Sequence, residues 1–117
     1  MKPWGYSFIL NAAGCDHEAL TSSDIISKFV KTLVNEIDMV AYGEPQIVNF
    51  GSGDKAGYTL VQLIETSNIC AHFVNELDEI YLDVFSCKPF NSQHVLDVFR
   101  TYFKPKSWNQ EFITRKA

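Results

Sequence analysis

The sequence predicts an α+β fold in which an antiparallel sheet carries two helices on one face, as a two-layer sandwich. Several short segments are rich in β-branched and aromatic residues, and two longer segments repeat apolar residues at helical spacing. The order strand, helix, several strands, helix, strand lacks the repeated crossovers of a parallel sheet. With 117 residues, 46% of them hydrophobic, the chain can form one core, so we expect a single domain over residues 1–117.

The first strand is expected at Trp4–Asn11, where aromatic and aliphatic residues follow one another. Phe8 and Leu10 would face one side of the sheet and Ile9 the other, because side chains alternate along a strand. A helix follows, since residues 21–24 offer several N-cap oxygens. Its buried stripe consists of Ile26, Phe29, Val30, Leu33 and Ile37.

Four strands are expected in the middle of the chain. A turn at Tyr42–Pro45 leads into the first of them. Residues 51–57 hold three glycines but match neither phosphate-binding glycine pattern, so we interpret them as a flexible hairpin connection. The expected strands are Gln46–Phe50, Tyr58–Ile64, Asn68–Val74 and Glu79–Phe85.

The second helix is predicted to open at Asn91–Gln93 and to stop at Lys104 and Pro105. Trp108–Arg115 alternates apolar and polar residues loosely, which is typical of an edge strand. The buried stripe of the second helix consists of Val95, Leu96, Phe99, Tyr102 and Phe103. With both helices on one face, the other face of the sheet would be bare, so we expect it to be covered in a homodimer.

Charge and cysteine usage narrow the class of protein. A net charge of −4 argues against a nucleic-acid partner and suits a cationic small substrate. No apolar run is long enough for a membrane span, and the first residues lack the regions of a signal peptide. Cys15, Cys70 and Cys87 show no C-x-x-C spacing, which indicates neither a disulfide framework nor a metal site. We therefore expect a cytoplasmic protein with no metal and no membrane partner.

The candidate catalytic side chains lie between Gly57 and Cys87. Ser67 is followed by His72 five residues later and by Cys87 twenty residues later. Taken singly, they would be a turn serine, a half-buried histidine and a strand-end cysteine. Taken together, and in the register of the family pattern described next, they favour an active-site set. His17 and His94 have no ligand-spaced companions, so we interpret them as surface residues.

Read without gaps from Ser67, the segment SNICAHFVNELDEIYLDVFSC places His72 at plus five, Glu76 at plus nine and an Asp-Val-Phe-x-Cys ending at Asp83–Cys87. The N-terminal segment MKPWGYSFILNAAGCD matches the beginning of the same family pattern. Together these motifs resemble the short prokaryotic type of pyruvoyl-dependent S-adenosylmethionine decarboxylase. The resemblance implies the two-layer fold of that family.

The resemblance also implies self-cleavage between Thr66 and Ser67. Ser67 Oγ would attack the Thr66 carbonyl, and the resulting ester would open by β-elimination. The products would be a β chain of residues 1–66 and an α chain of residues 67–117. A pyruvoyl group derived from Ser67 would be the cofactor, and it would form a Schiff base with the substrate amine.

Further roles follow from the resemblance, position by position. His72 would carry protons, and Thr59 matches the second processing hydroxyl, which is usually serine. Cys87 matches the thiol that returns a proton to the substrate α-carbon. Glu76 matches the carboxylate that holds the ribose hydroxyls of S-adenosylmethionine.

The chain departs from the family pattern in several places. Thr66 stands where glutamate is usual, and Asn68 stands where histidine is common. Gly53 falls at the position of the phenylalanine that stacks on adenine, so Phe50 and Trp4 are the candidate stacking residues.

The resemblance implies decarboxylation of S-adenosylmethionine for spermidine biosynthesis by a homodimer of processed protomers. Two alternatives remain at this point. One is a pyruvoyl-dependent decarboxylase of a basic amino acid such as ornithine or arginine, which the missing stacking residue and the acidic segment after Glu76 would favour. The other is an unprocessed, non-catalytic homologue, which Thr66 and Asn68 would favour.

Overall fold

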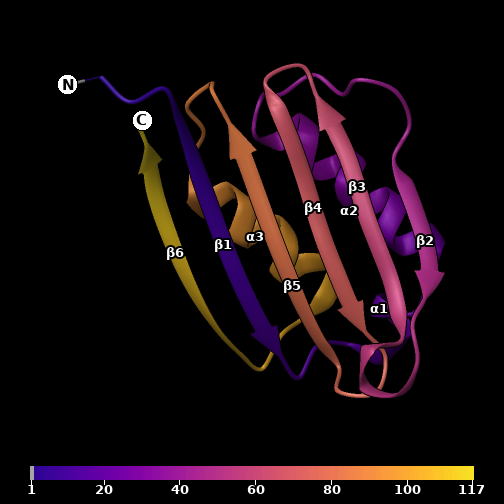
Figure 1. Ribbon diagram of the computed structural model, residues 1–117. Helices are drawn as coiled ribbons and strands as arrows, with labels where there is room; N and C mark the ends of the chain where they lie inside the picture. Colours follow the sequence, from indigo (N-terminus) through magenta and orange to yellow (C-terminus); the bar gives the residue numbers. More distant parts are fainter. Residues whose placement is uncertain (1) are drawn as a thin grey trace.

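The computed structural model describes residues 2–117, which form one six-stranded sheet with the order β2-β3-β4-β5-β1-β6. Every pair of neighbouring strands is antiparallel. The helices lie together behind one face of the sheet (Figure 1), which confirms the predicted α+β architecture. The elements are β1 (Gly5–Ala13), α1 (His17–Leu20), α2 (Ser23–Glu36), β2 (Gln46–Phe50), η1 (Gly53–Lys55), β3 (Gly57–Ile64), β4 (Ser67–Val74), β5 (Glu79–Ser86), α3 (Ser92–Phe103) and β6 (Ser107–Arg115).

Side-chain caps begin both long helices. Ser22 Oγ accepts a hydrogen bond from the Ile25 N–H at 3.2 Å before α2, and Asn91 Oδ1 accepts one from the Gln93 N–H at 2.9 Å before α3. The single turn α1 was not predicted, because four residues cannot carry an apolar repeat. Within the described range, 2–117, no helix is long and apolar enough to span a bilayer.

The core lies between the sheet and the two long helices. Phe29 of α2 packs edge-to-face on Phe99 and Phe103 of α3, with ring centroids 5.9 and 4.9 Å apart. Phe73 of β4 meets Phe103 at 5.5 Å, and all four rings are fully or almost fully buried. This packing holds β4 firmly in the middle of the sheet, and both turns at its ends are thereby positioned.

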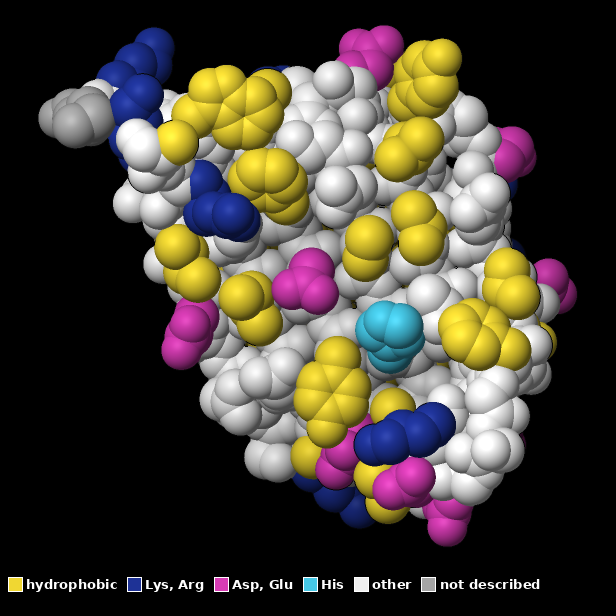
Figure 2. All heavy atoms as spheres, in the orientation of Figure 1, with side chains coloured by type: hydrophobic (Ala, Val, Ile, Leu, Met, Phe, Trp, Pro, Cys, Tyr) yellow, Lys and Arg dark blue, Asp and Glu magenta, His cyan; other side chains and the backbone are white. Residues whose placement is uncertain are grey.

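The opposite face of the sheet is bare (Figure 2). Hydrophobic side chains are spread across it, with an acidic side chain and a histidine among them. The large apolar residues on its strands are each 38% to 58% exposed; they are Val48, Phe50, Leu63, Tyr81 and Ile113. We call this side of the sheet the open face.

Candidate functional site

The turn between β3 and β4 contains the candidate cleavage site. Ile64 of β3 pairs with Ser67 of β4, so only Glu65 and Thr66 connect the two strands. Ser67 has a φ of +155°, a value that residues with a Cβ rarely adopt. Strain of this kind persists only where the surrounding structure imposes it, and it is characteristic of functional sites. The residue predicted to attack its own peptide bond is therefore the strained residue of this turn.

The Thr66 carbonyl, which would be attacked, accepts a hydrogen bond from the backbone N–H of Cys87 at 3.0 Å. Cys87 directly follows β5, whose last residue, Ser86, pairs with Ser67. The end of β5 thus brings a polarising donor to the carbonyl and the exposed Cys87 thiol to its neighbourhood. Three predicted residues, Thr66, Ser67 and Cys87, are brought together here.

The Thr66 side chain is also held. Its Oγ1 lies 2.8 Å from the Ser86 Oγ and 3.3 Å from the Met39 Sδ. Ser86 is fully buried, and its Oγ accepts a hydrogen bond from the Lys88 N–H at 3.0 Å. Ser86 was not predicted from the sequence, because it occupies the variable position of the Asp-Val-Phe-x-Cys motif. Met39 carries no motif signal that would have indicated its role.

Thr59 and His72 form a second group. They are directly opposite each other on β3 and β4, and Thr59 Oγ1 lies 3.1 Å from His72 Nδ1. Both side chains lie on the open face, since they alternate with the buried Leu60, Ala71 and Phe73. The structure therefore joins two predicted catalytic residues into one hydrogen-bonded pair.

The two groups are separated within one chain. Ser67 and His72 are five residues apart along β4, which at about 3.3 Å per residue amounts to about 16 Å. No direct proton transfer between their side chains is feasible over that distance. Within one chain, the predicted catalytic residues therefore form two separate groups, Ser67 with Cys87 and Thr59 with His72.

The predicted substrate-binding residues are divided in the same way. Trp4 lies at the Ser67 end of the sheet, 6.0 Å from the Phe85 ring, and the Arg115 guanidinium lies 5.0 Å from that ring on β6. These three side chains line a hollow of about 290 Å³ together with Lys116 and Ala117. Phe85 and Arg115 were not predicted from the sequence.

Phe50 and Glu76 lie at the other end. Phe50 pairs with Gly57, the first residue of β3, and Glu76 is exposed in the turn between β4 and β5. Asn75, beside Glu76, donates its N–H to the carbonyl of Ala56, beside Gly57, at 3.1 Å. One chain therefore does not bring Glu76 and Phe50 to Ser67.

The other two thiols differ from Cys87 in exposure. Cys15 is buried, and its pKa is raised to about 12 by burial and then by the negative charges of Asp78 and Glu79. Burial and then Asp83 also raise the pKa of Cys70. Raised values keep both thiols protonated and unreactive near neutral pH. Among residues 2–117, no group of three His, Cys, Asp or Glu side chains is placed to hold a metal ion.

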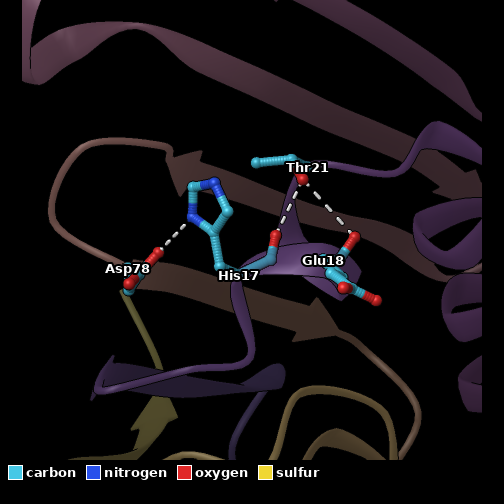
Figure 3. Close-up of polar contacts among 4 residues, drawn as sticks. All are labelled: His17, Glu18, Thr21 and Asp78. Atoms are coloured by element: carbon cyan, nitrogen blue, oxygen red, sulfur yellow. Dashed lines mark hydrogen bonds and ion pairs between the residues drawn. The ribbon is translucent and has the colours of Figure 1, made fainter.

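His17 is exposed, as expected for a surface residue, but it has a partner. Its Nδ1 lies 2.6 Å from Asp78 Oδ1, at the turn between β4 and β5 (Figure 3). Asp78 has a φ of +53°, and its carbonyl accepts a hydrogen bond from the Cys15 N–H at 2.9 Å. This far turn is thus also tied to the first part of the chain.

Both the sequence and the fold of this chain match a known family. Residues 6–116 match the family model of S-adenosylmethionine decarboxylase. The fold is similar to the crystal structure of the adenosylmethionine decarboxylase from Aquifex aeolicus VF5, with a TM-score of 0.86 and 20% sequence identity, over 100% of this chain and 94% of that one. The chain belongs to the S-adenosylmethionine decarboxylase family.

Proposed function

We propose that this protein cleaves itself between Thr66 and Ser67 and then decarboxylates S-adenosylmethionine. The observation that supports this most directly is the turn itself. A serine with a φ of +155° follows a carbonyl that accepts a backbone hydrogen bond at 3.0 Å. Strain and polarisation at one peptide bond, in a chain of this family, favour attack by the serine hydroxyl.

In the first step Ser67 Oγ adds to the Thr66 carbonyl carbon, and the Cys87 N–H stabilises the negative charge on the oxygen. The C–N bond breaks, the nitrogen gains a proton, and an ester remains. Loss of the α-proton of residue 67 then expels the Thr66 carboxylate. The dehydroalanine left at residue 67 takes up water and releases ammonia, which yields a pyruvoyl group on the chain 67–117.

The site around Ser67 fits this group, because a strand end with an exposed thiol and an adjacent hollow leaves room for a substrate. A pyruvoyl group supplies a carbonyl that condenses with an amine and accepts electrons as carbon dioxide leaves. The exposed Cys87 thiol would deliver a proton at this end. Trp4 and Phe85 offer aromatic surfaces to the adenine ring.

A second copy of the chain completes the site. Thr59 and His72 lie about 16 Å from Ser67 along β4, on the open face. If two open faces pack together around a two-fold axis near Cys70, midway along β4, His72 of one copy approaches Ser67 of the other. The same rotation brings Glu76 and Phe50 of the second copy to the Ser67 end of the first copy's sheet. We therefore propose a homodimer in which each active site is shared.

Membership of the family supports the biological setting, which we propose to be spermidine biosynthesis in the cytoplasm. The product would supply aminopropyl groups. The net charge of −4 suits the cationic sulfonium substrate.

The test is intact mass under denaturing conditions, followed by release of carbon dioxide from carboxyl-labelled S-adenosylmethionine. We expect two chains, residues 1–66 and 67–117, the second blocked by a keto group. A single 13.3 kDa chain after long incubation would refute the proposal and support the non-catalytic alternative. Labelled ornithine and arginine in parallel assays separate the substrates, and preferred turnover of either would refute the S-adenosylmethionine assignment.

Shared sites are tested by co-expressing two inactive variants with different tags. Ser67→Ala lacks the nucleophile and His72→Ala lacks the imidazole. In a mixed dimer, the His72→Ala chain keeps its own Ser67 and receives His72 from its partner, so we expect this chain alone to be cut. Failure of the mixture to cut any chain, with mixed dimers verified by pull-down, would contradict the shared site.

A further inference from the structure

We infer that Ser86 and Thr66 act as positioning residues for self-cleavage, an inference that rests on the proposed function. Their hydroxyls lie 2.8 Å apart in the core side of the turn, and Ser86 is fully buried. Neither hydroxyl touches the attacked carbonyl. Each hydroxyl acts on the Thr66 carbonyl through the backbone.

Thr66 is hydrogen-bonded at two points by adjacent residues at the end of β5. Ser86 holds its side chain, and the next residue, Cys87, holds its carbonyl oxygen at 3.0 Å. Fixing Cα through the side chain and the oxygen through a hydrogen bond leaves the carbonyl little rotational freedom. We call this arrangement the Thr66 clamp.

Ser86 also shapes the donor itself. Its Oγ accepts the Lys88 N–H at 3.0 Å, a local side-chain to backbone bond that bends the chain across Cys87. That bend sets the direction of the Cys87 N–H, which lies between the two bonded residues. Losing the Ser86 hydroxyl would therefore loosen both points of the clamp.

The hydroxyl hydrogens have a consistent arrangement that ends on sulfur. Because Ser86 Oγ accepts from Lys88, its own hydrogen points to Thr66 Oγ1 or to the Met39 Sδ at 3.6 Å. The Thr66 hydroxyl then takes the other direction, to Ser86 or to Met39 at 3.3 Å. In both arrangements the buried Met39 thioether is the terminal acceptor.

This network requires a side chain at position 66 that both donates and accepts hydrogen bonds. A carboxylate cannot donate to the Met39 sulfur or to Ser86 when ionised, and its charge would lie beside a buried thioether. A hydroxyl donates and accepts within the same volume. The clamp is thus built for threonine or serine at position 66.

The test measures the half-time of conversion to two chains, by intact mass, in precursor made by cell-free translation. We expect Ser86→Ala and Thr66→Val to slow cleavage about ten-fold each, and Thr66→Ser to restore it. The double variant should be no slower than the slower single variant, because both remove the same bond. Thr101→Val, on the exposed side of α3, is the matched control and should cleave at the wild-type rate.

The outcomes separate the clamp from the proposed function. A wild-type chain that is never cut would refute both. A wild-type chain that is cut, with Ser86→Ala cut at the same rate, would refute the clamp alone. If Ser86→Ala does not fold by circular dichroism, Met39→Leu keeps the volume and removes the acceptor, and we expect it to slow cleavage about three-fold. Wild-type cleavage in folded Met39→Leu would then refute the clamp.

Discussion

The two turns at the ends of β4 are built alike and differ in chemistry. Each holds a residue other than glycine with positive φ, Ser67 in the first and Asp78 in the second. In each, a carbonyl accepts a hydrogen bond from the backbone of a distant segment, Thr66 from Cys87 and Asp78 from Cys15. Each also has a side chain tied to a neighbour, through Ser86 in the first turn and through His17 in the second.

The difference is where the strain falls relative to the polarised carbonyl. In the first turn the strained residue is a serine that directly follows the hydrogen-bonded carbonyl, so its hydroxyl lies beside the peptide bond that we propose it attacks. In the second turn the strained residue is Asp78 itself, in a left-handed conformation that aspartate tolerates well, and Glu79 follows it. On the proposed mechanism, strain and a backbone donor alone would not give self-cleavage, because the nucleophile must come next in sequence.

Removing the nucleophile should have the largest effect. Ser67→Ala should give a single uncut chain at all times, since no hydroxyl remains to attack Thr66. Glu79→Ser is the matched test of the second turn: it adds a serine after the bonded Asp78 carbonyl and should give no cut there, because residue 79 lacks a positive φ. Intact-mass measurement shows whether either variant is cut. A new cut before residue 79 would show that strain is not required.

Substrate binding should depend on the aromatic surface at the Ser67 end of the sheet. Trp4→Ala should raise KM for S-adenosylmethionine about ten-fold with self-cleavage unchanged, because it removes a stacking surface beside Phe85. Thr101→Val, on the exposed side of α3 in the helix layer, is the control and should leave KM unchanged. An unaltered KM in Trp4→Ala would remove this residue from the binding site.

The free energy of unfolding should fall at alkaline pH because of Cys15, which is hydrogen-bonded to the second turn. Cys15 has a pKa raised to about 12 by burial and by Asp78 and Glu79, so its thiol stays neutral in the folded chain after the unfolded chain begins to ionise near pH 9.0. The contribution is complete below pH 9.0 and is lost as pH rises toward 12. Urea unfolding should show a steeper fall in free energy above pH 9 for wild type than for Cys15→Ala. Parallel curves for the two proteins would contradict the raised value.

The smallest effect is expected at His17. His17→Ala removes an exposed pair with Asp78 and should lower the free energy of unfolding by at most about 0.5 kcal/mol, without changing the cleavage rate. His94→Ala, an exposed histidine on α3, serves as the reference in the same urea titration. A slower cleavage in His17→Ala alone would mean that the two turns are coupled through β4.

Local patterns predicted the fold because they reflect local physics. The alternation that places Phe8 and Leu10 inward is confirmed by their complete burial. The one-turn helix α1 was missed, since its conformation depends on contacts rather than on a repeat. The bond between Thr59 and His72 follows from strand register, which the sequence leaves open. Contacts through Met39 and Ser86 depend on how the chain folds over the turn, so no motif marks them.

The strand order gives self-cleavage a consequence for assembly. Residues 1–66 supply β2, β3 and β1, and residues 67–117 supply β4, β5 and β6, with β1 inserted between β5 and β6. A cut chain would therefore stay together through three ladders, β3–β4, β5–β1 and β1–β6, and a native gel would not reveal the break. Refolding, however, would require two molecules to meet. For the cut protein, the midpoint of thermal unfolding should then rise with protein concentration. Once cut, a protein that unfolds would therefore seldom refold.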